Sequence, residues 1–402
     1  MNELYELTNP VFNTAKMTLT LLSAVGNEDS IAIEKALGFE QMPHVDAKGD
    51  EYALLKRIGA ITIELRYALA NRMIEQAGNK NVLDLACGYT PKAKYLMDRG
   101  FSYVGGDLPA VVEDMARVSK ELLGGKALFQ AVDVTNGESV AAAAANLPAG
   151  PVTIDCEGLV AYLDKNELTA MVKNFAAVLA ARGGCWVTTD FESDSYFLAI
   201  AQAVSAGQGE KFLKLVESQV EKKTADAAHA PVFADDEEKI AFLQSMGLAV
   251  ERRPITGLAD MGLRTLYACT PEQRQAIAAA LEKINVWIMT PDGAAKAADA
   301  GAKGFAIRQT QDGDVLTMRL AGRLDSISAP ELLAAFRAAD GESAVKDVTL
   351  DLQDLEYTSS AGLRVMLIMY KQLGQGHFRL LHVNDTVSAI LRDTGFDQVF
   401  LA

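Results

Sequence analysis

Residues 81–108 read NVLDLACGYTPKAKYLMDRGFSYVGGDL, and this stretch predicts the fold of the chain. An apolar run at 82–85 leads into a turn that contains Gly88, and apolar residues at helical spacing follow over 93–97. A second apolar run ends at Gly105, Gly106 and Asp107. This order of strand, glycine turn, helix, strand and acid predicts a βαβ unit of an α/β, Rossmann-like domain that binds a nucleotide-like cofactor.

The residues of the turn indicate which cofactor is expected. Small residues at Ala86 and Gly88 let the backbone approach a ligand, and Asp107 follows 19 residues after Gly88, where its carboxylate can accept two hydrogen bonds from a ribose diol. A dinucleotide fingerprint reads G-x-G-x-x-G, but Pro91 and Lys92 stand in place of its third glycine. We therefore expect a nucleoside without pyrophosphate, S-adenosylmethionine. A tight turn without a ligand is the alternative.

Three further residues are candidates for the same site. Glu157 follows the fourth predicted strand, so it lies at the edge where parallel sheets bind ligands, and its carboxylate can pair with an α-ammonium group. Asp133 follows the third strand and either accepts from an adenine amino group or caps its own turn. Arg66 precedes the first strand, on a predicted helix that is expected to cover the cofactor cleft. A place in the cofactor site and a solvated or ion-paired arginine are equal alternatives for this residue.

Composition limits the classes of function. The 402 residues suffice for two or three domains, and the formal net charge of −15 argues against a general surface for nucleic acid or anionic membrane. No apolar run reaches the roughly 18 residues of a membrane span, and the N-terminus shows no basic-then-apolar signal. The four cysteines lack metal-ligand spacing, so we expect buried reduced thiols, no metal and a cytoplasmic location.

The order of predicted elements divides the chain into 1–290, a linker at 291–304 and a second domain at 305–402. Helices before residue 75 are expected to form a lid over the cofactor cleft, and strands alternate with helices over 81–190. Closing strands are expected at 248–252 and 263–268, and a helix at 270–290. The second domain should begin with a β-hairpin around Asp312-Gly313 and end in a short strand at 399–401.

The first 270 residues resemble class I S-adenosylmethionine-dependent methyltransferases, and most closely the leucine carboxyl methyltransferase and polyketide O-methyltransferase-like family. The resemblance is carried by VLDLACGYTPKAKYL, YVGGDLPAVVEDM and IDCEGLVAYLDKNELTAMVKNF. The family usually reads G-A-G-x-D-x-R at the turn, where this chain has ACGYTPK. The resemblance implies that the following residues bind the cofactor: Arg66, Ala86, Gly88, Asp107, Leu108, Asp133, Val134 and Glu157.

The last 100 residues resemble the STAS domain of anti-sigma factor antagonists through VTLDLQDLEYTSSAGLRVML. Family members carry an aspartate and then a phosphorylated serine at this turn. Here Ser359 occupies the aspartate position and Ser360 the phosphorylated one. The resemblance implies a serine kinase or anti-sigma factor as partner, whereas a simple helix N-cap is the alternative for these serines.

Two functions are therefore expected from the sequence. In the first, the protein is a methyltransferase that acts on a small-molecule or carboxylate acceptor and is regulated by its STAS domain. In the second, it is a regulatory protein whose larger domain senses S-adenosylmethionine or is degenerate. No catalytic base is assigned: His44, ahead of the cofactor domain, is a lid or loop histidine. Whether the chain forms a homodimer is left open by the sequence.

Overall fold

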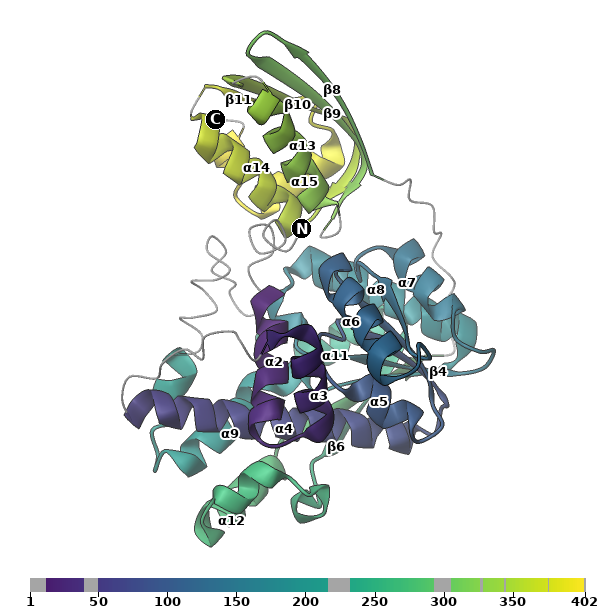
Figure 1. Ribbon diagram of the computed structural model, residues 1–402, viewed down its shortest axis with the longest axis vertical. Coiled ribbons are helices and arrows are strands. Elements are labelled where there is room, and N and C mark those ends of the chain that lie inside the picture. The colour runs from purple at the N-terminus through teal and green to yellow at the C-terminus, as the bar shows by residue number, and fades with distance from the viewer. Residues whose placement is uncertain are drawn as a thin grey trace. The chain divides into compact units, whose positions relative to one another are not determined.

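The computed structural model describes residues 12–39, 50–215, 232–292, 305–325, 328–342, 345–374 and 376–400. His44, residues 216–231 and most of the predicted linker lie outside these ranges. The chain divides into two compact units, one within 13–298 and one within 299–402 (Figure 1). Both are α/β units, which confirms the predicted fold class.

The larger unit is built on a seven-stranded sheet of order β3-β2-β1-β4-β5-β7-β6. Strands β1 to β5 pair in parallel, and β7 pairs antiparallel with both β5 and β6. The strands are β1 (Asn81–Leu85), β2 (Ser102–Asp107), β3 (Leu128–Ala131), β4 (Val152–Cys156), β5 (Gly184–Thr188), β6 (Leu248–Pro254) and β7 (Asn285–Pro291). The order reverses between β1 and β4, and ligands of such sheets bind at this switch point.

The described helices of the larger unit lie against this sheet or against one another (Figure 1). They are α2 (Phe12–Ala24), α3 (Glu28–Leu37), α4 (Asp50–Ala77), α5 (Lys92–Met97), α6 (Pro109–Leu122), α7 (Gly137–Ala145), α8 (Lys165–Arg182), α9 (Ser193–Val204), α11 (Asp236–Ser245) and α12 (Pro271–Leu281). The core between the sheet and α7 and α8 contains both tryptophans, Trp186 and Trp287, which are fully buried. Packing of these apolar faces fixes the strand ends that carry the candidate site.

The prediction for the end of the larger unit was partly wrong. Residues 248–252 form part of β6, as expected, but 264–268 form the short 3-10 helix η5 (Arg264–Ala268) instead of a strand. The predicted helix over 270–290 ends at Leu281, and the apolar run after it is β7. Because β7 lies between two strands, its buried residues 286–289 are continuously apolar, and periodicity cannot distinguish such a run from a buried helix.

The smaller unit has a four-stranded sheet of order β11-β10-β9-β8. Its elements are β8 (Ala306–Asp312), β9 (Val315–Leu324), α13 (Ala329–Glu342), β10 (Asp347–Thr358), α14 (Ser360–Leu373), β11 (Phe378–Leu381), α15 (Asp385–Asp393) and α16 (Asp397–Phe400). The β8–β9 hairpin confirms the turn predicted at Asp312-Gly313, where Gly313 has φ +61°.

The last prediction for the smaller unit, a strand at 399–401, was wrong. Residues 397–400 form helix α16, and the ring of Phe400 packs against those of Phe378 and Tyr370. This burial against the core, which local sequence does not report, stabilises the helical turn.

Candidate functional site

The carboxyl ends of β1, β2 and β4 bring three predicted site residues to one edge of the sheet. Strand β1 lies between the other two, and Leu85 is in register with both Gly106 and Cys156. The turn at Gly88, Asp107 at the end of β2 and Glu157 just after β4 therefore follow neighbouring strand ends. These strand ends meet at the switch point of the sheet, the edge that we call the crevice and at which sheets of this kind bind ligands, and a cofactor contact of the three residues stays a prediction.

The glycine turn is held by Asp107. The Gly88 N–H donates to Asp107 Oδ2 over 2.7 Å, and the Leu108 N–H donates to Oδ1 over 2.7 Å. Both Ala86 and Gly88 have φ +56°, which is strained for alanine. Burial raises the pKa of Asp107 to about 6 against the opposing effect of these two N–H groups. Each carboxylate oxygen keeps a lone pair for a further donor.

The N-terminal helices lie over this turn. A Cβ atom on Gly88 would lie 3.6 Å from the Cβ of Ala15, which belongs to α2. The ring of Phe39, just beyond α3, makes an edge-to-face contact with Tyr89 at 5.2 Å between centroids. These contacts place α2 and the end of α3 where the sequence predicted a lid.

On the other side of the crevice, Glu157 and Arg66 form a buried ion pair. Arg66 Nη2 donates to Glu157 Oε2 over 3.0 Å, and both side chains are about 15% exposed. Arg66 Nε donates to Thr189 Oγ1 over 3.0 Å, and the Thr189 N–H donates to Glu157 Oε1 over 2.7 Å. The Arg66 guanidinium also contacts the Asp190 carboxylate. Sequence reasoning placed Arg66 and Glu157 here but missed Thr189 and Asp190.

The charge of this cluster shifts its titration. Burial, and next the negative charge of Asp190, raise the pKa of Glu157 to about 7, although Arg66 opposes the shift. Burial opposes protonation of Arg66, but Asp190 and Glu157 outweigh it and raise the pKa of the guanidinium. Arg66 therefore stays a cation, and Glu157 can gain or lose its proton near neutral pH.

The third-strand residues are placed differently. Asp133 Oδ1 accepts from the N–H and from the hydroxyl of Thr135, both over 2.7 Å, so this carboxylate caps its own turn. The Val134 carbonyl accepts from Asn174 Nδ2 over 2.8 Å. The turn-capping role, one of the two that the sequence left open, is present, and a contact of Asp133 or Val134 with adenine stays a prediction.

A buried charge cluster under the glycine turn was not predicted. Lys92 at the start of α5 contacts Asp84 of β1, with 3.3 Å between Nζ and Oδ1, and Asp155 of β4. The Tyr103 hydroxyl donates to Asp84 Oδ2 over 2.6 Å. Burial raises the pKa of both carboxylates, and Lys92 opposes this. The sequence signal for this cluster is that Asp84 and Asp155 each interrupt a mostly apolar strand, and the two residues pair in register.

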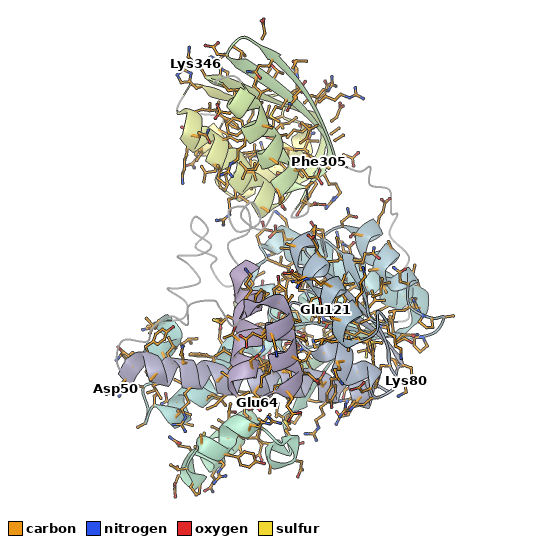
Figure 2. The ribbon with its side chains drawn as sticks, viewed as in Figure 1. Asp50, Glu64, Lys80, Glu121, Phe305 and Lys346 are labelled. Atoms are coloured by element: carbon orange, nitrogen blue, oxygen red, sulfur yellow. The ribbon has the colours of Figure 1, made fainter. Side chains whose placement is uncertain are left out.

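A groove of about 530 Å³ runs along another face of α4. Glu64 (labelled in Figure 2), Asn71 and Glu75 are among the residues that line it, and Arg66 is not. The Glu64 carboxylate accepts from the N–H groups of Arg264 and Thr265. The groove is therefore separate from the crevice, and its residues offer control positions on the same helix.

In the smaller unit, the loop after β10 carries the two serines of the motif. Ser359 is the N-cap of α14: its hydroxyl accepts from the Gly362 N–H over 3.4 Å, and its own N–H donates to the Leu324 carbonyl over 2.9 Å. Ser359 is only 3% exposed. Ser360 is the first residue of α14, and its side chain lies outside the described atoms. Capping by Ser359 is thus present, and phosphorylation of Ser360 stays a prediction.

Comparison with known proteins identifies the smaller unit. The family model described as "Mlab, STAS domain" matches residues 307–402. An anti-sigma factor antagonist of Bordetella bronchiseptica, BtrV by name, is 39% identical over 83 residues, which are 20% of this chain and 71% of that protein. The class defined here is an α/β chain with a STAS domain. Through residues 307–402 the chain belongs to the STAS family, which confirms the resemblance.

Solved structures resemble each unit. The crystal structure of an anti-sigma factor antagonist from Mycobacterium paratuberculosis is 23% identical and covers 24% of this chain and 83% of its own, with a TM-score of 0.22. Magnesium protoporphyrin IX methyltransferase from Synechocystis PCC 6803, with bound S-adenosylhomocysteine, is 12% identical and covers 63% of this chain and 92% of its own, with a TM-score of 0.34. Among the described residues, none of the helices is both long and apolar enough to cross a bilayer.

Proposed function

We propose that the larger unit binds S-adenosylmethionine in the crevice and transfers its methyl group to an oxygen of a small molecule or of a carboxylate. The observation that carries the proposal is the convergence of Gly88, Asp107 and the Arg66–Glu157 pair at the carboxyl edge of the sheet, at the switch point. Backbone at a tight turn beside opposed acidic and basic side chains suits an adenosyl amino acid better than a dinucleotide.

Each residue has a role in this proposal. Asp107, with Leu108 beside it, accepts from the ribose hydroxyls. Asp133 and Val134 lie nearest to the adenine. Glu157 accepts from the α-ammonium group and Arg66 binds the α-carboxylate, so their mutual ion pair in the present structure exchanges for contacts to the two ends of one amino acid. Ala86 and Gly88 leave room for the methionine portion along the backbone.

When bound, S-adenosylmethionine supplies an activated methyl group, which passes to an acceptor oxygen as its C–S bond breaks, a C–O bond forms and S-adenosylhomocysteine remains. The chain's own contribution is then to align acceptor and donor. A carboxylate acceptor with a pKa near 4 is already ionised at neutral pH and needs no base, whereas a phenol or alcohol needs one.

Isothermal titration with S-adenosylhomocysteine tests the cofactor directly. We expect binding by the wild-type chain, and Asp107→Ala should weaken it by about tenfold or more, because hydrogen bonds to charged groups contribute about 1.5–3 kcal/mol each. Glu113→Ala, an exposed acid on the neighbouring helix α6, is the matched control and should bind as the wild type does. Absence of heat with both S-adenosylmethionine and S-adenosylhomocysteine would reject the proposal.

The same titration should depend on pH. Asp107 and Glu157 must be ionised to accept from the ligand, and their pKa values are raised to about 6 and about 7. Affinity should therefore be weak near about pH 5.5, rise through both values and level off above about pH 8. Glu157→Gln should lose the upper part of this rise. A flat profile over this range would show that neither carboxylate contacts the ligand.

We also propose that the STAS unit docks a serine kinase of the anti-sigma factor type and is phosphorylated on Ser360. Membership of the STAS family and the place of Ser360 at the start of α14 favour this role, because a helix start stabilises an added phosphate. Mass spectrometry of the chain purified from its native host should find one phosphate on Ser360. Phosphate on neither serine under any growth condition would count against the proposal, and Ser360→Ala is the control.

A further inference from the structure

We propose that Asp190 is a positioning residue that sets the affinity of the crevice for the amino-acid half of its ligand. The proposal rests on the proposed cofactor function, and it adds a residue that neither the motif nor the family resemblance indicates. Asp190 lies just after β5, in the 3-10 helix η3 (Asp190–Glu192), and its side chain is only 2% exposed. It therefore acts through its neighbours and does not touch the ligand.

The first role of Asp190 is to hold the loop after β4. Its Oδ1 atom accepts from the Gly158 N–H over 2.7 Å, and its Oδ2 atom accepts from the N–H groups of Leu159 and Val160 over 2.8 and 3.0 Å. These three residues directly follow Glu157. The carboxylate thus fixes the backbone that presents the acid expected to bind the α-ammonium group.

The second role of Asp190 is to hold Arg66. Its Oδ1 atom also accepts from the Arg66 guanidinium, which comes from α4. One buried carboxylate therefore joins α4, the loop after β4 and the end of β5. The Asp190 N–H donates to Thr188 Oγ1 over 3.0 Å, and that hydroxyl donates to the Cys156 carbonyl over 2.8 Å. Asp190 itself is therefore held by residues of β5 and β4.

Four donors converge on Asp190, and only a carboxylate can accept from all of them. An asparagine keeps the shape but turns one acceptor into a donor, which would face either backbone N–H groups or the guanidinium. The adenosine half of the ligand is expected at Asp107, whose hydrogen bonds involve the β1 turn and Leu108 and not this cluster. Loss of the Asp190 carboxylate should therefore weaken the binding of the amino-acid half of the ligand only.

Two ligands separate the two halves. S-adenosylhomocysteine carries the amino acid, whereas 5′-methylthioadenosine keeps the adenosine and the thioether but lacks the α-ammonium and α-carboxylate groups. In isothermal titration of the full chain, Asp190→Asn should weaken S-adenosylhomocysteine by about tenfold or more and leave 5′-methylthioadenosine within about twofold of wild type. Glu75→Gln, in the separate groove on the same α4 helix, should change neither.

A double-variant cycle tests the route of the effect. In an Arg66→Ala background, Asp190→Asn should cost less than it does alone, because one of the two groups that it positions is absent. Thr189→Val, which removes the hydroxyl that joins Arg66 and Glu157, should show the same selectivity and serves if Asp190→Asn fails to fold. If Asp190→Asn weakens the binding of both ligands equally, or leaves S-adenosylhomocysteine binding unchanged, the role proposed for Asp190 is wrong, but the cofactor proposal is not affected. A wild-type chain that binds neither ligand would overturn the cofactor proposal itself.

Discussion

Lys92→Met is expected to destabilise the larger unit by about 3–5 kcal/mol, because it leaves two buried carboxylates without their cation. Asp84 and Asp155 are both fully buried and are in register on adjacent strands. Methionine fills much of the space of the lysine stem but supplies no charge. The free energy of unfolding is measured in denaturant by tryptophan fluorescence, since Trp186 and Trp287 are the chain's two tryptophans and both lie in the larger unit.

The pH dependence of this loss has a definite sign. Without Lys92, the pKa values of Asp84 and Asp155 rise further in the folded state. The folded variant then binds more protons than its unfolded chain does, so its stability falls as the pH rises. The difference in stability between wild type and variant should therefore be larger at about pH 8 than at about pH 6. Adding Asp155→Asn to the variant should recover part of the loss, because only one buried carboxylate then remains.

Lys94→Met is the matched control for this prediction. Lys94 lies on the same helix but is 37% exposed, and it pairs with Asp98 one turn away. An exposed pair of this kind contributes about 0.3–0.5 kcal/mol, so the control should be close to wild type. Equal stability of the two variants would mean that Lys92 is not the charge partner that the cluster requires.

Gly362→Ala is expected to destabilise the STAS unit by about 3 kcal/mol, at the upper end of the cost of overpacking. A Cβ atom at this position would lie under 3.0 Å from Thr358 Oγ1 and from the Cγ and the carbonyl oxygen of Leu324. That carbonyl cannot move away freely, because it accepts from the N–H of Ser359. The alanine therefore forces apart β9 and the start of α14, where the phosphorylation candidate lies.

Two spectroscopic signals distinguish the units in this experiment. Far-UV circular dichroism reports both units, and tryptophan fluorescence reports the larger one, so Gly362→Ala should lower the stability of one transition and leave the fluorescence transition unchanged. S-adenosylhomocysteine binding should also be unchanged. Gly395→Ala is the control: its φ is +74° with no atom within 4 Å, so only about 1–2 kcal/mol of backbone strain is expected. A shift of the fluorescence transition by Gly362→Ala would contradict the prediction that the substitution acts only on the STAS unit.

Much of the crevice could be predicted because its residues follow strand ends that the sequence itself marks. Gly88 and Glu157 follow the ends of β1 and β4, Asp107 is the last residue of β2, and parallel strands bring such positions to one edge. The strand at 285–291 could not be predicted, since its pairing partners β5 and β6 are distant in sequence and its apolar run fits a helix equally well.

The α/β class, the strand ends at the switch point and the STAS motif could be predicted from the residues alone, because these features depend on local periodicity and on residue types at fixed spacing. The pairing of the buried charges, by contrast, became visible only in the folded chain. Lys92 pairs with Asp155 and Arg66 pairs with Asp190, although the partners are 63 and 124 residues apart in the sequence. Buried charges must be paired, but no local pattern encodes the partner, since the low dielectric that enforces the pairing exists only once the sheet and its helices have packed.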